Sequence, residues 1–106
     1  MIEKRQYARL NISLPVRLET ITLDRKEVLD LETRDISYSG TFINTLTFFP
    51  EGTRFILDFT LPSDNLKEFK DIKSLEGCAG TMVRSDLHGI AIQFDKECQI
   101  EGLKAL

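Results

Sequence analysis

The chain has 106 residues, of which 42% are hydrophobic and 29% are charged, and its formal net charge is −3. This length and composition predict one globular domain with a modest core. The acidic balance argues against general binding to nucleic acid, which needs a basic face. No apolar run is long enough for a membrane helix, and none follows the charged N-terminal residues as in a secretory signal. We therefore expect no membrane insertion and a cytoplasmic location.

The first half of the chain predicts three strands. They are expected over residues 11–18, 28–34 and 41–45, and apolar and polar residues alternate in the first two. Pro15 lacks an N–H group, so it predicts an edge position or a bulge in the first strand. The phase of the alternation shifts at Ile21 and Leu23, which also suggests a bulge. The polar residues 35–40 are expected to connect the second and third strands.

The second half predicts three more strands and a short helix. The strands are expected over 54–61, 74–84 and 90–94, and the helix over 96–106. Pro62 ends the first of these strands, which has the cleanest alternation in the chain. Short strands joined by hairpin turns are typical of a sandwich or a closed barrel, so the fold class is expected to be dominated by β-structure. The helix can then cover one mouth of the barrel.

Two polar motifs interrupt this strand pattern. Arg5 and Arg9 form an Arg-x-x-x-Arg spacing before the first strand, and Asp35, Ser37 and Gly40 form an Asp-x-Ser-x-x-Gly turn between the second and third strands. Each motif alone is also the ordinary composition of a solvated terminus or a tight turn. Together, with a strand pair between them, they resemble the paired signature of the PilZ family of bacterial cyclic di-GMP receptors.

The resemblance to the PilZ family extends over nearly the whole chain. It continues in the turn over 49–53 and in the closing hairpin over 80–94. It implies a single domain over residues 1–106, built as a six- to seven-stranded antiparallel barrel with a short C-terminal helix. The implied parts are a mobile arginine-bearing arm over 1–10, the barrel over 11–94 and the helix over 96–106.

The residue types in the two motifs suit the chemistry of cyclic di-GMP, which has two phosphates and two guanines. The arginine fork can bind phosphate oxygens or the O6 and N7 acceptors of guanine. A carboxylate only accepts hydrogen bonds, so it suits the N1 and N2 donors of guanine. The resemblance implies that Arg5 and Arg9 bind phosphate and guanine edges. It also implies that Asp35 and Ser37 bind a guanine and that Gly40 shapes the turn.

Two further residues are secondary candidates for ligand binding. Lys4 stands where members of the family often carry arginine, and lysine keeps the charge but loses the planar fork. Arg84 ends a strand beside the closing hairpin, where it can either contact ligand or be a plain surface charge. No specific motif decides between these two interpretations of Arg84.

The resemblance predicts a receptor or adaptor that changes the conformation of its N-terminal arm on binding. It would signal through a partner in the motility, biofilm or exopolysaccharide machinery. The alternative is a PilZ-like protein–protein interaction module that does not bind nucleotide, and the two retained arginines count against it. An enzyme is not expected, because the chain has no nucleophile triad and no phosphate-binding glycine loop. Cys78, Cys98 and His88 form no metal motif, so neither a metal nor a cofactor is expected.

Overall fold

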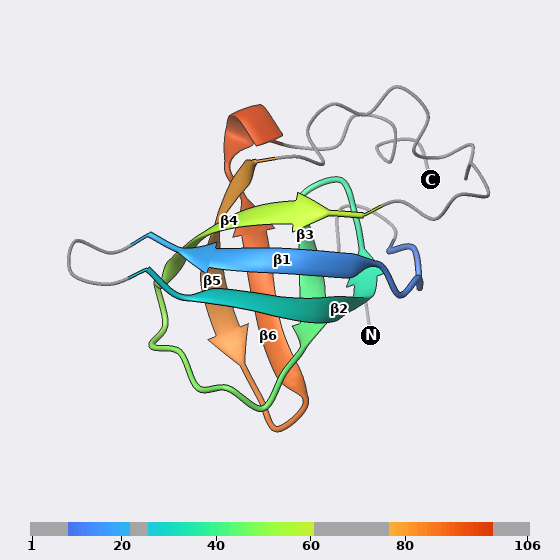
Figure 1. The fold of residues 1–106 in the computed structure, drawn as a ribbon. Helices are drawn as coiled ribbons and strands as arrows, with labels where there is room; N and C mark the ends of the chain where they lie inside the picture. The colour runs from blue at the N-terminus through green and yellow to red at the C-terminus, as the bar shows by residue number, and fades with distance from the viewer. Residues whose placement is uncertain (1–8, 22–25, 61–76, 99–106) are drawn as a thin grey trace, which may run out of the picture.

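The computed structural model describes residues 9–21, 26–60 and 77–98, whose strands form a closed antiparallel barrel in the order β1-β2-β3-β6-β5-β4 (Figure 1). The strands are β1 (Pro15–Thr20), β2 (Val28–Ile36), β3 (Gly40–Asn44), β4 (Arg54–Phe59), β5 (Cys78–Ser85) and β6 (Gly89–Phe94). The expected β-rich fold with a six-stranded antiparallel barrel is therefore confirmed. In Figure 1, β1, β2 and β4 cross the front of the barrel, and β3, β5 and β6 run behind them.

The apolar core lies inside the barrel, because every second residue of a strand points to the same face. Val16 and Leu18 of β1 and Phe55 and Leu57 of β4 are all at most 2% exposed. Phe49, in the connection before β4, packs edge-on against Phe55, with the ring centroids 5.0 Å apart. Burial of each large apolar side chain stabilises the fold by about 1.5–3 kcal/mol. The alternating pattern of the sequence therefore translates directly into the inner face of the barrel.

The expectation for Pro15 is wrong. This residue is not at a sheet edge, because β1 pairs with β2 on one side and with β4 on the other. Pro15 is the first residue of its strand, where a missing N–H interrupts no inner rung of the ladder. Its carbonyl still accepts a hydrogen bond from the N–H of Thr60 at 2.9 Å. β1 ends at Thr20 in unbroken register, so Ile21 makes no bulge in it, and Leu23 lies outside the described residues.

The C-terminal helix expected over 96–106 is not seen in the described part of the chain. Lys96–Cys98 form a single 3-10 turn, η3, closed by a hydrogen bond from the N–H of Cys98 to the carbonyl of Asp95 at 2.9 Å. The sulfur of Cys98 accepts a hydrogen bond from the N–H of Ala79 at 3.2 Å, which holds this turn against β5. Residues 99–106 lie outside the described residues.

Within the described ranges, no helix is long and apolar enough to span a membrane.

Two irregularities in strand register shape the rear of the barrel. The pairing of β2 with β3 shifts between Thr33 and Asp35, which makes Arg34 an extra residue in β2. The pairing of β5 with β6 shifts between Met82 and Arg84, which makes Val83 an extra residue in β5. A β-bulge of this kind bends its strand and turns side chains that a regular strand would direct elsewhere. The two bulged strands flank the β3–β6 pair.

Candidate functional site

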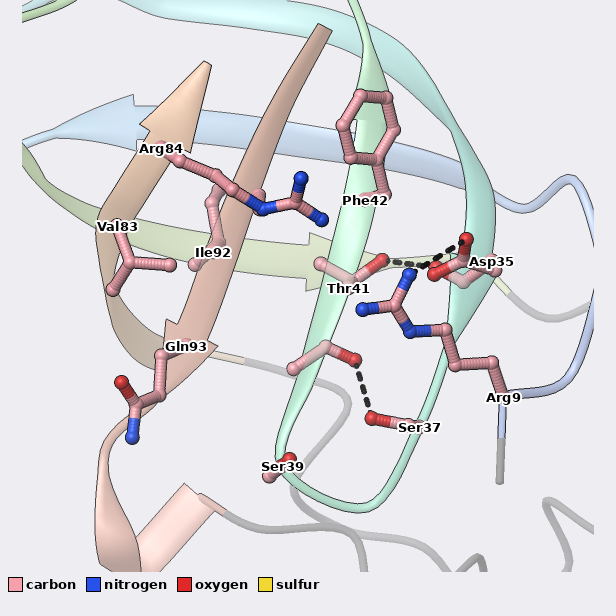
Figure 2. A pocket seen from close by; sticks show the side chains of 12 residues that line it. Arg9, Asp35, Ser37, Ser39, Thr41, Phe42, Val83, Arg84, Ile92 and Gln93 are labelled. Carbon is pink, nitrogen blue, oxygen red and sulfur yellow. Dashed lines mark hydrogen bonds and ion pairs between the residues drawn. The ribbon is translucent and has the colours of Figure 1, made fainter. Parts of the chain in front are cut away.

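A cavity of about 220 Å³, here called the outer cavity, lies on the outer surface of β3 and β6. It is lined by Arg9, Asp35, Ser37, Ser39, Gly40, Thr41, Phe42, Val83, Arg84, Ala91, Ile92 and Gln93 (Figure 2). Strand register explains why these residues meet. Asp35 of β2 is opposite Phe42 of β3, and Phe42 is opposite Ala91 of β6. Ala91 is in turn opposite Arg84 of β5, so one row crosses four strands from a carboxylate to a guanidinium.

The two bulges place the charged residues at the ends of this row. In β2, Thr33 and Ile36 are both buried, although a regular strand would point them to opposite faces. The extra residue Arg34 absorbs this difference and lets Asp35 face the outer cavity. In β5, the same kind of irregularity puts Val83 and Arg84, which are consecutive in sequence, on the wall of one cavity.

Arg9 reaches the site because the segment before β1 is fixed to β2. Leu10 and Ile36 exchange two backbone hydrogen bonds of 2.7 and 3.0 Å, as an isolated antiparallel bridge. The hydroxyl of Thr33 donates to the carbonyl of Ile12 at 2.7 Å, which holds the next part of the same segment. Arg9 therefore enters the outer cavity from a backbone that is tied down directly after it.

Asp35 is the most enclosed charged group of the site, with a side chain only 7% exposed. Nη1 of Arg9 lies 3.9 Å from its Oδ2, and Nε of Arg34 donates a hydrogen bond to the same oxygen at 3.4 Å. The guanidinium of Arg34 also stacks on Phe42, with Cζ 3.8 Å from the ring centroid. A buried carboxylate needs such partners, because removing an unpaired charge from water is costly.

The Ser37–Gly40 turn closes the end of the outer cavity. The N–H of Ser37 donates to the carbonyl of Gly40 at 2.8 Å, and the Ser37 hydroxyl donates to the same oxygen at 3.3 Å (Figure 2). Gly40 does not have a positive φ; among the described glycines, only Gly52 and Gly77 do. Its requirement is close packing, since a Cβ at this position would lie 2.4 Å from the carbonyl oxygen of Ile92. In the structure, Gly40 therefore allows β3 to approach β6 closely.

Arg84 supplies a second cation opposite Arg9. Its side chain extends from β5 across β6 toward β3 (Figure 2). Within the described residues it forms no ion pair, whereas Arg9 shares Asp35 with Arg34. The lining of the cavity also includes Gly40 and Ala91, which have little or no side chain. Among its described lining residues, the outer cavity therefore combines two arginines with one enclosed carboxylate, which suits an anionic ligand that also donates hydrogen bonds.

Comparison with known protein families identifies the family of the chain. A sequence model of the PilZ domain matches residues 3–106, which is essentially the whole chain. The chain belongs to the PilZ family. PilZ domains are binding and adaptor modules rather than enzymes, and the family is one of cyclic di-GMP receptors. A search of curated proteins found no match.

In this PilZ domain, the structure brings most of the sequence-predicted site residues together. Arg9, Asp35, Ser37, Gly40 and the secondary candidate Arg84 all line the outer cavity. The other two predicted residues, Lys4 and Arg5, lie outside the described residues. Arg84 is exposed and lies in the wall of the cavity, where its charge faces the space that a ligand would occupy.

Sequence reasoning missed Arg34 and Phe42 of this PilZ domain. One signal was available, because the apolar positions Leu29 and Leu31 change phase before Ile36, as they must where a strand carries an extra residue. Nothing in the sequence indicated that Phe42 would point outward beneath an arginine. That arrangement depends on the register between β2 and β3, which only the folded barrel defines.

Proposed function

We propose that this PilZ domain is a receptor for cyclic di-GMP and binds it in the outer cavity. One observation carries the proposal. Arg9 and Asp35, from two motifs separated by a strand pair, meet with Nη1 3.9 Å from Oδ2, and both line the cavity with Ser37 and Gly40. A surface turn and a solvated terminus have no reason to converge in this way, so the convergence supports a ligand that needs both.

The chemistry of each group suits a part of the ligand. The carboxylate of Asp35 can accept hydrogen bonds from N1 and N2 of a guanine. Arg9 can exchange its long contact with Asp35 for a shorter bidentate bond to phosphate. Arg84 forms no ion pair with the described residues, so its charge can bind a second phosphate or a guanine edge, and the small residues Gly40 and Ala91 leave room for a planar ring.

The size of the outer cavity supports a role for the N-terminal arm. Its volume of about 220 Å³ is below the roughly 300–1,000 Å³ of typical small-molecule sites. A ligand of two nucleotides therefore extends beyond it, and we propose that the arm carrying Lys4 and Arg5 covers the remainder. The bridge between Leu10 and Ile36 provides a fixed end from which the arm closes. Arm closure would change the surface offered to a partner protein, which is how the receptor would signal without catalysis.

The test is the melting temperature with and without cyclic di-GMP, with GTP and cyclic di-AMP as control ligands. At about 100 times its dissociation constant, a specific ligand adds about 2.7 kcal/mol of stability, which for about 100 residues is a rise of roughly 10 °C or more. The wild type should show this rise with cyclic di-GMP alone. The Arg5→Ala/Arg9→Ala double variant should lose this rise. Arg17→Ala, which changes an exposed ion pair on β1, should keep it.

Absence of a rise at high ligand concentration, in a folded sample free of nucleotide, would overturn the proposal. The domain would then be better interpreted as an interaction module that does not bind nucleotide. A rise of equal size in the Arg5→Ala/Arg9→Ala double variant would show that cyclic di-GMP binds elsewhere on the domain.

A further inference from the structure

Arg34 directly precedes Asp35 in the sequence and belongs to neither of the two motifs. The strand register, Asp35 and Phe42 each restrict its position. It is the extra residue of the β2 bulge, so its backbone position follows from the strand register. Its Nε donates to Oδ2 of Asp35 at 3.4 Å, and its Cζ lies 3.8 Å from the centroid of the Phe42 ring. Phe42 is only 2% exposed, which makes it a rigid base for the guanidinium. The Arg34 side chain is 47% exposed, and its backbone position and the Phe42 ring direct its Nε donor toward a single carboxylate oxygen.

The contacts to Asp35 are unevenly divided between its two oxygens. Arg9 and Arg34 both approach Oδ2. From the described residues, no hydrogen bond reaches Oδ1. Fixing one oxygen of a planar group limits its rotation, because the Nε donor prefers a narrow range of angles. Arg34 thus sets the direction in which the carboxylate of Asp35 presents its remaining acceptor capacity to the outer cavity.

We propose that Arg34 is a positioning residue that sets the base selectivity of this site; the inference rests on the proposed function. A guanine offers N1–H and the N2 amino group as neighbouring donors on one edge, whereas an adenine offers neither at these positions. An oriented carboxylate therefore accepts two hydrogen bonds from guanine. When adenine occupies the same position, the carboxylate receives neither of them. A site built to receive such hydrogen bonds rejects an analogue that lacks the donors. If Asp35 rotates freely, this discrimination weakens.

The experiment compares the dissociation constants of cyclic di-GMP and cyclic di-AMP by calorimetry in the full chain. Arg34→Met removes the Nε donor and the charge, and Arg34→Lys keeps the charge but loses the planar stack on Phe42 and the fixed direction. We expect both variants to narrow the preference for cyclic di-GMP by at least about tenfold, since a hydrogen bond to a charged group is at stake. The affinity for cyclic di-AMP should change much less.

Matched variants separate positioning from other effects. Arg17→Met makes the same side-chain change at an exposed ion pair and should leave the preference unchanged. Phe42→Leu removes the ring beneath Arg34 and should reproduce part of the loss. In an Asp35→Asn background, Arg34→Met should cause no additional loss of preference, because the two residues act as one unit. Each variant is measured well below its own melting temperature, so that binding is compared between folded proteins.

Three outcomes decide the inference. Loss of preference in both Arg34 variants, with none in Arg17→Met, supports it. Retention of preference in Arg34→Lys overturns it, because charge alone would then suffice. Equal weakening of both dinucleotides in Arg34→Met also overturns it, since that is the effect of removing a nearby charge. If the wild type binds no cyclic di-GMP, the proposed function is wrong. If the wild type binds cyclic di-GMP with a preference that the Arg34 variants do not change, only the inference about Arg34 is wrong.

Discussion

The front and rear walls of the barrel share one core but differ in their outer surfaces. On the front wall, β1 pairs with β2 and with β4 in unbroken register, and none of these three strands contains glycine. On the rear wall, β3, β5 and β6 each contain one glycine, and the register shifts on both flanks of the β3–β6 pair. Regular pairing, as on the front wall, is sufficient to form a barrel. The departures from regularity are concentrated where the outer cavity lies, which is typical of a functional surface.

Two ion pairs, one in the middle of the front wall and one at the outer cavity, show what this difference means. On the front wall, Nε of Arg17 is 2.9 Å from Oδ1 of Asp30, but the side chains are 60% and 74% exposed. At the outer cavity, where the bulged end of β2 adjoins the rear wall, Arg9 is farther from Asp35, at 3.9 Å, but the Asp35 side chain is 7% exposed. Water and salt screen the closer pair, whereas the enclosed carboxylate depends on its partners. A short distance is thus a poorer guide to function than the surroundings of the charge.

The largest expected effect comes from filling the space between β3 and β6. Gly40→Ala would place a Cβ 2.4 Å from the backbone oxygen of Ile92, which cannot move without opening the sheet. We expect a loss of about 3 kcal/mol or more in the free energy of unfolding, measured with urea. Gly52→Ala is the control, because its Cβ meets nothing within 4 Å and only its positive φ is strained. An equal loss in both variants would contradict the packing explanation.

The next effect compares the two aspartates directly. Asp35→Asn keeps the shape of the side chain but replaces an acceptor oxygen with a donor group, so we expect the dissociation constant for cyclic di-GMP to rise roughly 10- to 100-fold. Asp30→Asn makes the same change on the front wall and should leave binding unchanged. Titration calorimetry of both variants checks this prediction. If the two substitutions raise the dissociation constant equally, Asp35 affects binding only through its negative charge and not through its place in the outer cavity.

The sequence predicted more of the front wall than of the rear wall, for a physical reason. Alternation of apolar residues determines which face of a regular strand is buried, so the inner faces of β1 and β4 could be predicted from the sequence. The motif spacing also singled out Asp35, Ser37 and Gly40, and the structure places all three on the lining of the outer cavity. The contacts of Arg34 with Asp35 and Phe42 could not be predicted, because the phase change in β2 indicates an extra residue but the pairing of β2 with β3 decides what that residue touches. The close packing at Gly40 likewise depends on β6, which is distant in sequence.

A smaller, acid-dependent effect is expected where the walls are joined. Arg54 of β4 binds Asp95, with Nη2 2.7 Å from Oδ2, and also donates to the hydroxyl of Thr81. The hydrogen bond from Arg54 lowers the pKa of Asp95. The pair therefore stabilises the fold fully above about pH 4, the unfolded value for aspartate, and this contribution is lost as the pH falls through the lowered pKa. Its size should be about 1 kcal/mol or less, because both side chains are partly exposed.

Urea midpoints measured between pH 7 and pH 3 check the contribution of the Arg54–Asp95 pair. Asp95→Asn should be less stable than the wild type at pH 7, and the difference should shrink as the pH falls below 4. Asp86 serves as the internal reference, because its pKa is lowered mainly by the backbone N–H of His88 and its acid sensitivity should persist in the variant. A constant difference at every pH would show that Asp95 stabilises the fold through packing alone.

The smallest effect is expected at the exposed pair of the front wall. The hydrogen bond and charge of Asp30 raise the pKa of Arg17, yet both side chains are largely in water. Arg17→Ala should therefore leave the urea midpoint indistinguishable from the wild type in 0.15 M salt, where charges on the surface are largely screened. A clear loss of stability that disappears at 1 M salt would show that the front pair contributes in spite of its exposure. Burial would then no longer explain why the ion pair at the outer cavity differs from the exposed pair, and the cavity would be distinguished only by the bulges and glycines around it.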